Sequence, residues 1–454
     1  MKLLRVPLVL AAAAMTLLAS PVPQAEAEAA APIPAANPDY DGDGKADVAA
    51  TMIDDWEARF IRVWYGSGRV ADIVADDLAA TQYGVSYPLL ARDLNGDGYT
   101  DLVVGTSDSS SARVQIIPGS AGGLQPANRH SFQVLNKAET TVTSFALVGS
   151  PVRRLAVGLS TYEGSHFDEQ VRLYKLTNSG TPTGSPVTLV PGSGKVPSLF
   201  KRGGLGSSMD ALGSQLFIGA PEAKVNGKAY AGAVLAVTLD SSGVKSTKTI
   251  TQATKSVTGA VGKYDSFGNA VVARDGYLVV GTPGDAVGAI KRTGSIQVFT
   301  VSSKGTIKPV KRIAQNSAGI PGKAEPDDSF GGYLALGATC KGVPTVLVGG
   351  AGEVIAKHED SDGSAWLIPL RTVKGCPAKQ IYEGHGLPGE PNYRGIGGVL
   401  AFVRNSAETN DDLVIGGSGS LSEGPPGRLY RISAVGGVVT QLGADDIFDS
   451  VAGR

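Results

Sequence analysis

Two short loops of this chain carry oxygen-bearing side chains at positions 1, 3, 5 and 9. The first loop contains Asp39, Asp41, Asp43 and Asp47, and the second contains Asp93, Asn95, Asp97 and Asp101. Alternate residues of a tight turn face a common centre, and carboxylate and carbonyl oxygens are the ligands that Ca²⁺ prefers. The sequence therefore predicts two calcium ions, each held by four side chains.

The residues after the second loop distinguish it from an EF-hand. In an EF-hand the twelfth position is a glutamate that leads into a helix. Here the twelfth residue is Val104, inside an apolar run that ends at Gly105 and is typical of a buried strand. We expect the ion to stabilise the turn between two strands, because repulsion between the carboxylates would otherwise loosen it. The alternative is an Asp/Gly turn that binds no ion.

The first residues of the chain are typical of an export signal. Lys2 and Arg5 precede an apolar segment, and small residues follow around Ala25. We expect a signal peptide over residues 1–27, a Pro/Ala-rich segment over 28–38 and a folded region over 39–454. No later run is long and apolar enough to span a bilayer. The sequence predicts a secreted, extracellular protein that is not inserted in a membrane.

Charge and cysteine content limit the classes of partner. The chain has 41 basic and 42 acidic residues, which argues against a nucleic-acid or anionic-membrane partner. The two cysteines, Cys340 and Cys376, are predicted to form one disulfide in an oxidising compartment. Two free buried thiols are the alternative.

Seven apolar runs recur along the chain at intervals of about 60 residues. Six of them end in a glycine, and the first ends in Thr51; the glycines are Gly105, Gly158, Gly219, Gly281, Gly349 and Gly416. Between these runs lie further short apolar segments separated by Gly, Asp and Pro, which fit three or four antiparallel strands per unit.

A unit of this size cannot bury both faces of its own sheet, so it must pack against its neighbours. We therefore predict an all-β fold, a seven-bladed β-propeller of about four-stranded antiparallel blades. A linear β-solenoid is the structural alternative. The first unit has only a Pro-rich segment where the second has the strand Val85 to Ala91, so it lacks an opening strand. The segment Asp445 to Val451 is predicted to supply it, so that the two ends of the chain close the ring.

The repeats resemble the FG-GAP repeat of integrin α-subunit heads and of secreted bacterial propellers. Phe267-Gly268 and Phe330-Gly331 match the Phe-Gly element, and Gly219-Ala220-Pro221 and Gly281-Thr282-Pro283 match the Gly-Ala-Pro element. The resemblance implies a seven-bladed propeller with calcium between the first two strands of some blades. Integrin heads carry these sites in later blades, whereas here the motif occurs in the first two. In the seventh unit Arg404 stands where the first carboxylate belongs, so we expect no calcium there.

A recognition surface is predicted on one face of the disc. The segments after each Gly-Ala-Pro-like element are long, and if they join the second and third strands they all emerge on that face. They carry aromatic and charged side chains suited to a carbohydrate or protein ligand, namely Tyr162, His166, Phe167, Lys228, Tyr230, Arg292 and His358. Ordinary solvated loops are the alternative interpretation.

Sequence support for catalysis is weak. The chain has no G-x-S-x-G, H-E-x-x-H, Walker or paired Cys-x-x-Cys motif, and its four histidines are scattered. We therefore expect a monomeric, calcium-stabilised, non-catalytic binding or adhesion module for an extracellular carbohydrate or protein. A hydrolase or lyase with its site in the central channel is the alternative, because channel residues need no linear motif.

Overall fold

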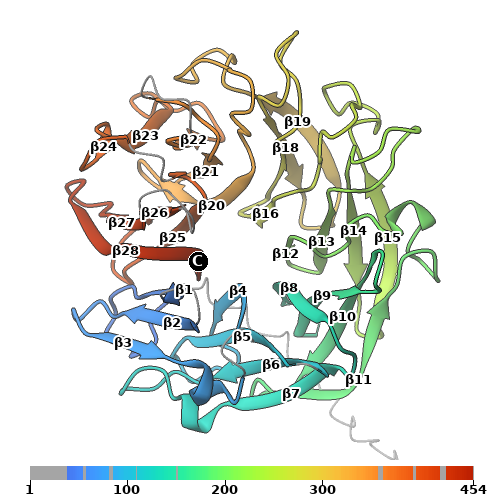
Figure 1. Cartoon of the computed structure of the whole chain (residues 1–454), viewed down its shortest axis with the longest axis vertical. Coiled ribbons are helices and arrows are strands. Elements are labelled where there is room, and N and C mark those ends of the chain that lie inside the picture. Colours follow the sequence, from blue (N-terminus) through green and yellow to red (C-terminus); the bar gives the residue numbers. More distant parts are fainter. Residues whose placement is uncertain are drawn as a thin grey trace, which may run out of the picture.

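The computed structural model describes residues 38–54, 58–80, 85–108, 110–149, 152–355, 361–391, 395–419 and 426–452. The predicted signal peptide and His358 lie outside these residues. Figure 1 shows small antiparallel sheets arranged radially around a central axis. Six hydrogen-bonded sheets form the seven blades of a β-propeller, because one seven-stranded sheet contains both the last blade and the first, which confirms the predicted fold.

Blades 1 to 3 contain the first eleven strands. They are β1 (Val48–Asp54), β2 (Ala58–Trp64) and β3 (Val70–Ile73) in blade 1, β4 (Val85–Arg92), β5 (Asp101–Ser107), β6 (Ala112–Ile117) and β7 (His130–Leu135) in blade 2, and β8 (Thr140–Val148), β9 (Arg154–Tyr162), β10 (Phe167–Leu176) and β11 (Pro182–Leu189) in blade 3.

Blades 4 to 7 contain the remaining strands. They are β12 (Met209–Leu212), β13 (Gln215–Ala220), β14 (Ala233–Leu239) and β15 (Val244–Ile250) in blade 4, β16 (Val271–Arg274), β17 (Tyr277–Thr282), β18 (Ser295–Val301) and β19 (Ile307–Ile313) in blade 5, β20 (Tyr333–Thr339), β21 (Val343–Gly350), β22 (Ser364–Pro369), β23 (Lys379–Glu383) and the short β24 (Gly386–Leu387) in blade 6, and β25 (Val399–Val403), β26 (Asp412–Gly419), β27 (Pro426–Ile432) and β28 (Val439–Ala452) in blade 7.

Helical structure in the described residues is limited to three short 3₁₀ turns, η1 (Ala75–Leu78), η2 (Pro126–Asn128) and η3 (Ser198–Phe200). Within the same residues, no helix is long and apolar enough to cross a membrane.

The glycine-terminated apolar runs are the second strands of the blades. They form β1, β5, β9, β13, β17, β21 and β26, as the repeat interval predicts. The glycines permit a close approach between blades. A Cβ atom on Gly281 would lie 2.0 Å from the carbonyl oxygen of Gly331, which belongs to the Phe-Gly element of the next blade. A side chain at this position would therefore force the two blades apart.

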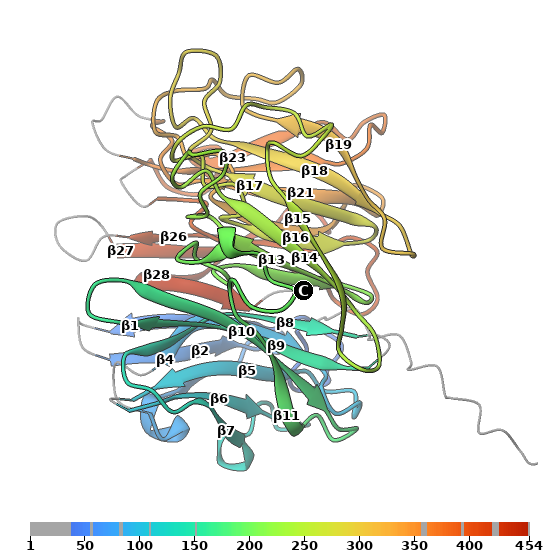
Figure 2. The ribbon, with the colours of Figure 1, turned by 90° about the vertical axis from the view of Figure 1, so that its right-hand side faces the viewer.

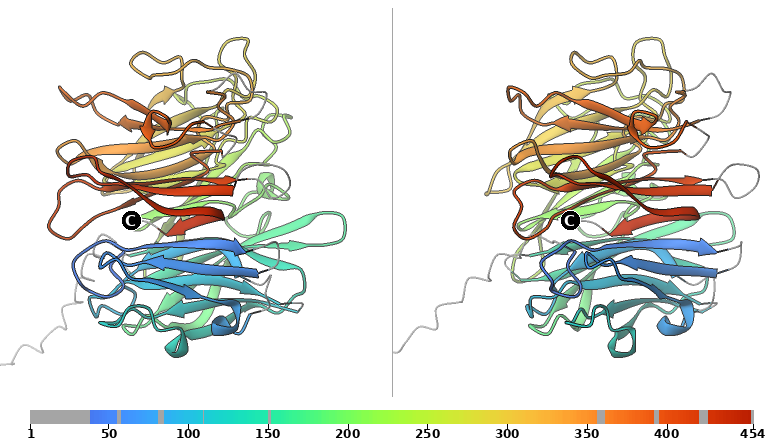
Figure 3. Two further views of the ribbon diagram at one scale, coloured as in Figure 1. Left: turned by 60° about the vertical axis from the view of Figure 1, so that its left-hand side comes forward. Right: turned by 90° about the vertical axis from the view of Figure 1, so that its left-hand side faces the viewer.

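Ring closure depends on β28, which belongs to two blades. Its first half pairs with β27 as the outer strand of blade 7, and its second half pairs with β1, from Ile447 opposite Ile53 to Ala452 opposite Ala49. Figure 3 shows this strand lying against the first blade. The prediction that Asp445 to Val451 supplies the missing strand is confirmed. The sequence did not predict that the strand also completes blade 7.

The core lies between blades. Buried apolar side chains of the described residues form seven clusters, and each cluster combines two neighbouring blades. The cluster between blades 4 and 5, for example, packs Phe217 and Val234 against Val271 and Leu278. Each blade is thus stable only against its neighbours, which is the physical reason for a closed ring.

The disc has two faces that differ in their connections. Because neighbouring strands are antiparallel, connections between first and second strands emerge on one face, and those between second and third strands emerge on the other (Figure 2). We call the first the carboxylate face, after the loops 39–47 and 93–101. The second is called the aromatic face, after Tyr162, Phe167, Tyr230 and Tyr264.

The predicted disulfide is present in blade 6. It joins Cys340, in the turn between β20 and β21, to Cys376, which precedes β23, with a Cα–Cα distance of 5.9 Å. Both residues belong to connections on the carboxylate face, so the bond ties together the two turns of one blade.

Candidate functional site

The first acidic loop brings three carboxylates together. Oxygen atoms of Asp39, Asp41 and Asp43 all lie within 4.8 Å of one another. Oδ1 of Asp39 and Oδ1 of Asp41 are buried without a hydrogen-bond donor. Burial raises the pKa of Asp39, and the charges of Asp43 and Asp41 add to this effect. Converging carboxylates with unsatisfied oxygens fit a hard cation.

The ninth residue of each loop is held differently. The carboxylate of Asp47 accepts hydrogen bonds from the backbone N–H groups of Tyr40 at 2.6 Å and Gly66 at 2.7 Å. Asp101 does the same with Leu94 at 2.8 Å and Gly119 at 3.1 Å. Each aspartate therefore ties its loop to the connection that follows the third strand of the blade.

Burial also raises the pKa of these two ninth residues, to about 7 for Asp47 and about 6 for Asp101, although the backbone amides oppose the shift. A cation beside them would favour their ionised forms. Each carboxylate oxygen has more than one lone pair, so Asp47 and Asp101 can bind an ion without losing these hydrogen bonds.

The side chains of the second loop bond to the loop itself. Asp93 accepts hydrogen bonds from the N–H groups of Gly96 at 2.6 Å and Gly98 at 3.1 Å. The side-chain nitrogen of Asn95 donates to Asp97 Oδ2 at 2.9 Å. The donor set suits calcium in its chemistry, but its oxygens already have partners, unlike Oδ1 of Asp39 and Oδ1 of Asp41 in the first loop.

The two loops touch across the junction of blades 1 and 2. The N–H of Asp39 donates to Thr100 Oγ1 at 3.1 Å, and the N–H of Thr100 donates to the carbonyl oxygen of Asp39 at 2.9 Å. The ring of Tyr99 lies against Gly42, where a Cβ atom would come within 2.5 Å of it. These contacts couple the conformation of one loop directly to that of the other.

Blade 7 carries a related loop that contains its own positive charge. Arg404 occupies the first position, as predicted, and its Nε atom lies 2.6 Å from Oδ1 of the buried Asp411. Asp412, at the ninth position, accepts the backbone N–H of Ala434 at 2.6 Å. The guanidinium group thus neutralises a carboxylate from the loop position at which blades 1 and 2 have Asp39 and Asp93.

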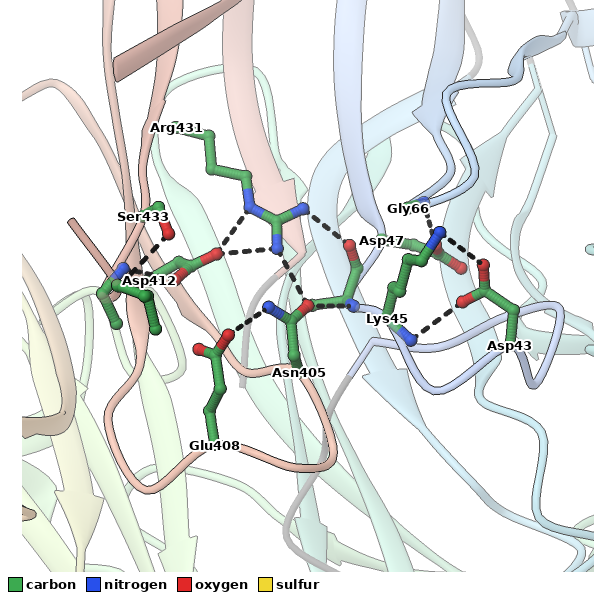
Figure 4. A network of polar contacts seen from close by, with 12 residues as sticks. Asp43, Lys45, Asp47, Gly66, Asn405, Glu408, Asp412, Arg431 and Ser433 are labelled. Atoms are coloured by element: carbon green, nitrogen blue, oxygen red, sulfur yellow. Dashed lines mark hydrogen bonds and ion pairs between the residues drawn. The ribbon is translucent and has the colours of Figure 1, made fainter. Parts of the chain in front are cut away.

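This loop also contacts the first acidic loop, as Figure 4 shows. Arg431 Nη1 donates to the carbonyl oxygen of Ala46 at 2.7 Å, and its Nε donates to Asp412 at 2.8 Å. Asn405 Oδ1 accepts the N–H of Ala46 at 2.9 Å. The end of the first loop is therefore fixed by the last blade.

On the aromatic face, the hairpin between β9 and β10 exposes a pair of rings. Tyr162 and Phe167 are 41% and 53% exposed, and their centroids lie 5.2 Å apart. On the same hairpin, Nε2 of His166 lies 3.5 Å from Oδ1 of Asp168. The structure brings together three of the predicted ligand-face residues.

A second exposed pair joins blades 4 and 5. Tyr230 stacks on Tyr264 with centroids 5.4 Å apart and an angle of 28° between the rings, which are 43% and 51% exposed. Lys263 Nζ lies 4.4 Å from the centroid of Tyr264, and Lys228 is exposed in the same loop as Tyr230. The sequence predicted Tyr230 and Lys228 but missed Tyr264 and Lys263. Tyr264 and Lys263 could have been predicted from their position directly before Asp265 and the Phe-Gly element, at the entry to a blade.

At the equivalent junction of blades 5 and 6 an ion pair replaces the stacked rings. Arg292 pairs there with Asp327. The backbone pattern is the same, since the N–H of Ser329 bonds to the carbonyl of Arg292 as that of Ser266 bonds to the carbonyl of Tyr230. The predicted ligand residue Arg292 is therefore already engaged by a neighbour.

A cavity of about 700 Å³ opens on the aromatic face beside the hairpin of Tyr162. Its lining includes charged residues of both signs, which are Lys137, Asp168, Glu169, Lys201 and Arg202. Burial raises the pKa of Glu169 to about 7, and its Oε2 atom has no hydrogen-bond donor. The cavity offers both acceptors and cations to a polar ligand.

The central channel also carries charged side chains, at its carboxylate-face end. Arg92 and Arg274 end two of the inner strands. Burial raises the pKa of the half-buried Asp210, and the charges of these two arginines oppose the shift. Burial lowers the pKa of Arg274, and the charge of Asp411 opposes this shift. Arg404 is ion-paired to Asp411. These groups form a network of opposite charges. The described histidines lie in three different blades and do not join it.

Three comparisons place these features among known proteins. A family model described as FG-GAP-like repeat matches residues 39–132, which include both acidic loops. A search of curated proteins gives no match. Two crystal structures of Sqt1 from Chaetomium thermophilum are similar at 13% and 12% identity, with TM-scores of 0.41 and 0.42. These similarities cover 80% and 81% of this chain and 74% of each Sqt1 chain.

Proposed function

We propose that this chain, whose FG-GAP-like repeats and seven blades fit the FG-GAP β-propeller family, is a secreted, calcium-stabilised and non-catalytic binding module for an extracellular carbohydrate. The observation that carries the proposal is the pair of exposed aromatic contacts, Tyr162 with Phe167 and Tyr230 with Tyr264, on one face of the disc.

The chemistry of this face suits a sugar. Aromatic rings offer flat apolar surfaces of negative potential, against which the C–H groups of a pyranose ring pack. The neighbouring cavity supplies carboxylate acceptors in Asp168 and Glu169 and donors in Lys201 and Arg202. A few polar groups around apolar contact surfaces are typical of small-ligand sites. A protein ligand uses the same aromatic residues but needs a larger flat surface.

The carboxylate face has a structural part in this proposal. Calcium held by Asp39, Asp41, Asp43 and Asp47, and by Asp93, Asn95, Asp97 and Asp101, stiffens the junction of blades 1 and 2. The buried, donor-free oxygens of Asp39 and Asp41 support the first of these sites. Such an ion supplies charge neutralisation and has no substrate to activate, because the ligand face lies on the opposite side of the disc.

A glycan and polysaccharide array tests the binding function. The mature protein is expected to retain a subset of glycans without releasing product. The double variant Tyr230→Ala/Tyr264→Ala is expected to bind at least tenfold more weakly, a loss of about 1.4 kcal/mol. Val70→Ala, which removes an exposed apolar side chain from the outer edge of blade 1, is the control and should bind as wild type.

The other outcomes contradict the proposal in distinct ways. Release of a shortened glycan would favour the alternative of a hydrolase or lyase that uses the charged central channel. A blank array together with retention of an extracellular protein would replace the carbohydrate by a protein ligand. Unchanged binding by the double variant would remove the ligand site from the aromatic face.

A further inference from the structure

Two acidic side chains are buried at the junction of blades 5 and 6. Asp328 is 1% exposed and Glu353 is 4% exposed. The side-chain nitrogens of Gln315 and Gln380 donate to the two oxygens of Glu353, at 2.7 and 3.2 Å. The N–H of Glu325 donates to Asp328 Oδ2 at 2.6 Å. All of these donors are neutral, and among the described residues neither carboxyl group forms an ion pair.

The preceding blade junction shows what this site lacks. There the carboxylate of Asp285 forms an ion pair with Arg312, whose Nη2 atom lies 2.6 Å and whose Nε lies 2.8 Å from Asp285 Oδ2. Asp265 lies close enough for its carboxyl group to interact with the charges of Asp285 and Arg312. Two acids and one guanidinium group therefore share this junction.

The two junctions correspond residue by residue. The carbonyl oxygen of Asp285 accepts the N–H of Gly294 at 2.9 Å, and that of Glu353 accepts the N–H of Gly363 at 2.8 Å. Each of these glycines forms a parallel bridge with the next blade. The second acid stands two residues before the phenylalanine of the Phe-Gly element in both cases. The corresponding pairs are Asp265 and Asp328, Asp285 and Glu353, Gln252 and Gln315, and Arg312 and Gln380. The built-in cation of one junction is thus replaced by a neutral carboxamide in the next.

Two buried oxygen atoms at the second junction have no donor. They are Oδ1 of Asp328 and Oε1 of Gln315, whose carboxamide is bonded to Glu353. The amide oxygen of Gln252 at the preceding junction also lacks a donor, so the second junction differs in the donor-free Oδ1 of Asp328 and in the missing guanidinium group. Burial raises the pKa of Glu353 to about 8, and the charge of Asp328 adds to this shift. Burial also raises the pKa of Asp328 to about 7, and the charges of Glu325 and Asp327 add to it. The site is short of positive charge and offers oxygen atoms to receive it.

We propose that Asp328 and Glu353, with the amide oxygen of Gln315, bind a calcium ion where the preceding junction holds the guanidinium group of Arg312. Carboxylate and carboxamide oxygens are the ligands of this ion. A divalent cation neutralises both carboxylates, which the two glutamine side chains cannot do. The site lies between blades on the aromatic-face side and is separate from the two acidic loops.

The test is the number of calcium ions bound per chain, counted by native mass spectrometry of the full protein in calcium. Gln380→Arg restores the internal cation of the preceding junction and is expected to bind one calcium fewer than wild type. Thr249→Arg is the matched control. It introduces the same side chain at the corresponding position of β15, in a blade whose acid positions are occupied by Gly203 and Ala223. Its calcium count should equal that of wild type.

A second variant keeps the test valid if the new arginine prevents folding. Glu353→Gln is nearly isosteric, removes one carboxylate and is also expected to lose one calcium. Equal counts for wild type and either variant would overturn the proposal, and would leave the two carboxyl groups sharing a proton. Loss of an ion in the Thr249→Arg control would also overturn it. Because the count is taken without any ligand, the result is independent of carbohydrate binding.

Discussion

Individual carboxylates of this ring are neutralised in different ways at related positions. Asp411 has the guanidinium group of Arg404, whereas Asp39 and Asp41 keep buried oxygens without a donor. The difference is one residue, since an arginine in blade 7 stands where blades 1 and 2 have aspartate. The first acidic loop has only two long ion pairs, of Arg69 with Asp41 and of Lys45 with Asp43, each at 3.9 Å, so we expect it to need a cation from solution.

Removal of one acidic ligand is expected to abolish most of the calcium dependence of stability. Asp43→Ala should melt at a lower temperature than wild type in millimolar calcium, and at the same or a higher temperature in chelator, because repulsion within the loop is relieved. The lost stabilisation is about 2.7 kcal/mol if free calcium is 100 times Kd. Differential scanning calorimetry with and without chelator measures the effect.

Asp72→Ala is the control for this experiment. Asp72 forms an exposed ion pair with Arg62 at 2.8 Å, worth at most about 1 kcal/mol. Its loss should shift both melting temperatures equally. If Asp43→Ala behaves in the same way, the assignment of Asp43 as a calcium ligand is wrong.

At the scale of the element, the Phe-Gly turn fastens each of the later blades to the one before it. Phe267 and Phe330 are fully buried, and each forms a parallel bridge with a glycine of the preceding blade. Gly331 has φ of +92°, a conformation unfavourable for residues with a side chain. A Cβ atom there would lie 2.6 Å from the carbonyl oxygen of Ser295. The turn therefore requires glycine for two separate reasons.

Gly331→Ala is expected to destabilise the protein by about 2 kcal/mol or more, from backbone strain together with the collision between blades. Gly319→Ala serves as the control, since φ is also positive at Gly319 but no atom lies within 4 Å of the added Cβ. It should cost only about 1 kcal/mol. Chemical denaturation of both variants compares the two costs, and equal values would show that the close approach between blades contributes nothing.

The sequence predicted the features that repeat and the closing strand Asp445 to Val451, but it missed the side-chain contacts between neighbouring blades. Glycines at regular intervals identified the second strands, and the spacing of Asp39 to Asp47 identified the first acidic loop. The contact between Tyr230 and Tyr264 could not be read from the sequence, because it joins a loop of one blade to the entry of the next. The ion pair of Arg292 could not be read from the sequence either, because its partner Asp327 precedes the first strand of the next blade.

At the scale of the whole molecule, stability depends on a closed ring. Each apolar cluster joins two blades, so an open ring leaves one cluster without its second half. The closing contact is the pairing of β28 with β1, supported by Arg431 and Asn405 against Ala46. Without the second half of β28, the inner edge of β1 would present unpaired backbone groups to other chains.

Deletion of residues 447–454 is therefore expected to lower the melting temperature and to produce dimers or larger species. The deletion removes the residues of β28 that pair with β1 but retains those that pair with β27. Size-exclusion chromatography with light scattering measures the oligomeric state. Deletion of residues 453–454, which follow β28, is the control and should leave a monomer. A monomeric, fully stable 447–454 deletion would show that the shared strand is dispensable.

The shared strand also sets the order of events when the protein is made. A ribosome releases β1 about 400 residues before its inner partner in β28 is synthesised. The first blade therefore waits incomplete while six further blades emerge, and contacts so distant in sequence form slowly. Under the secretion that we propose, this delay would favour export, because a ring that cannot yet close leaves the chain easier to thread through a translocation pore.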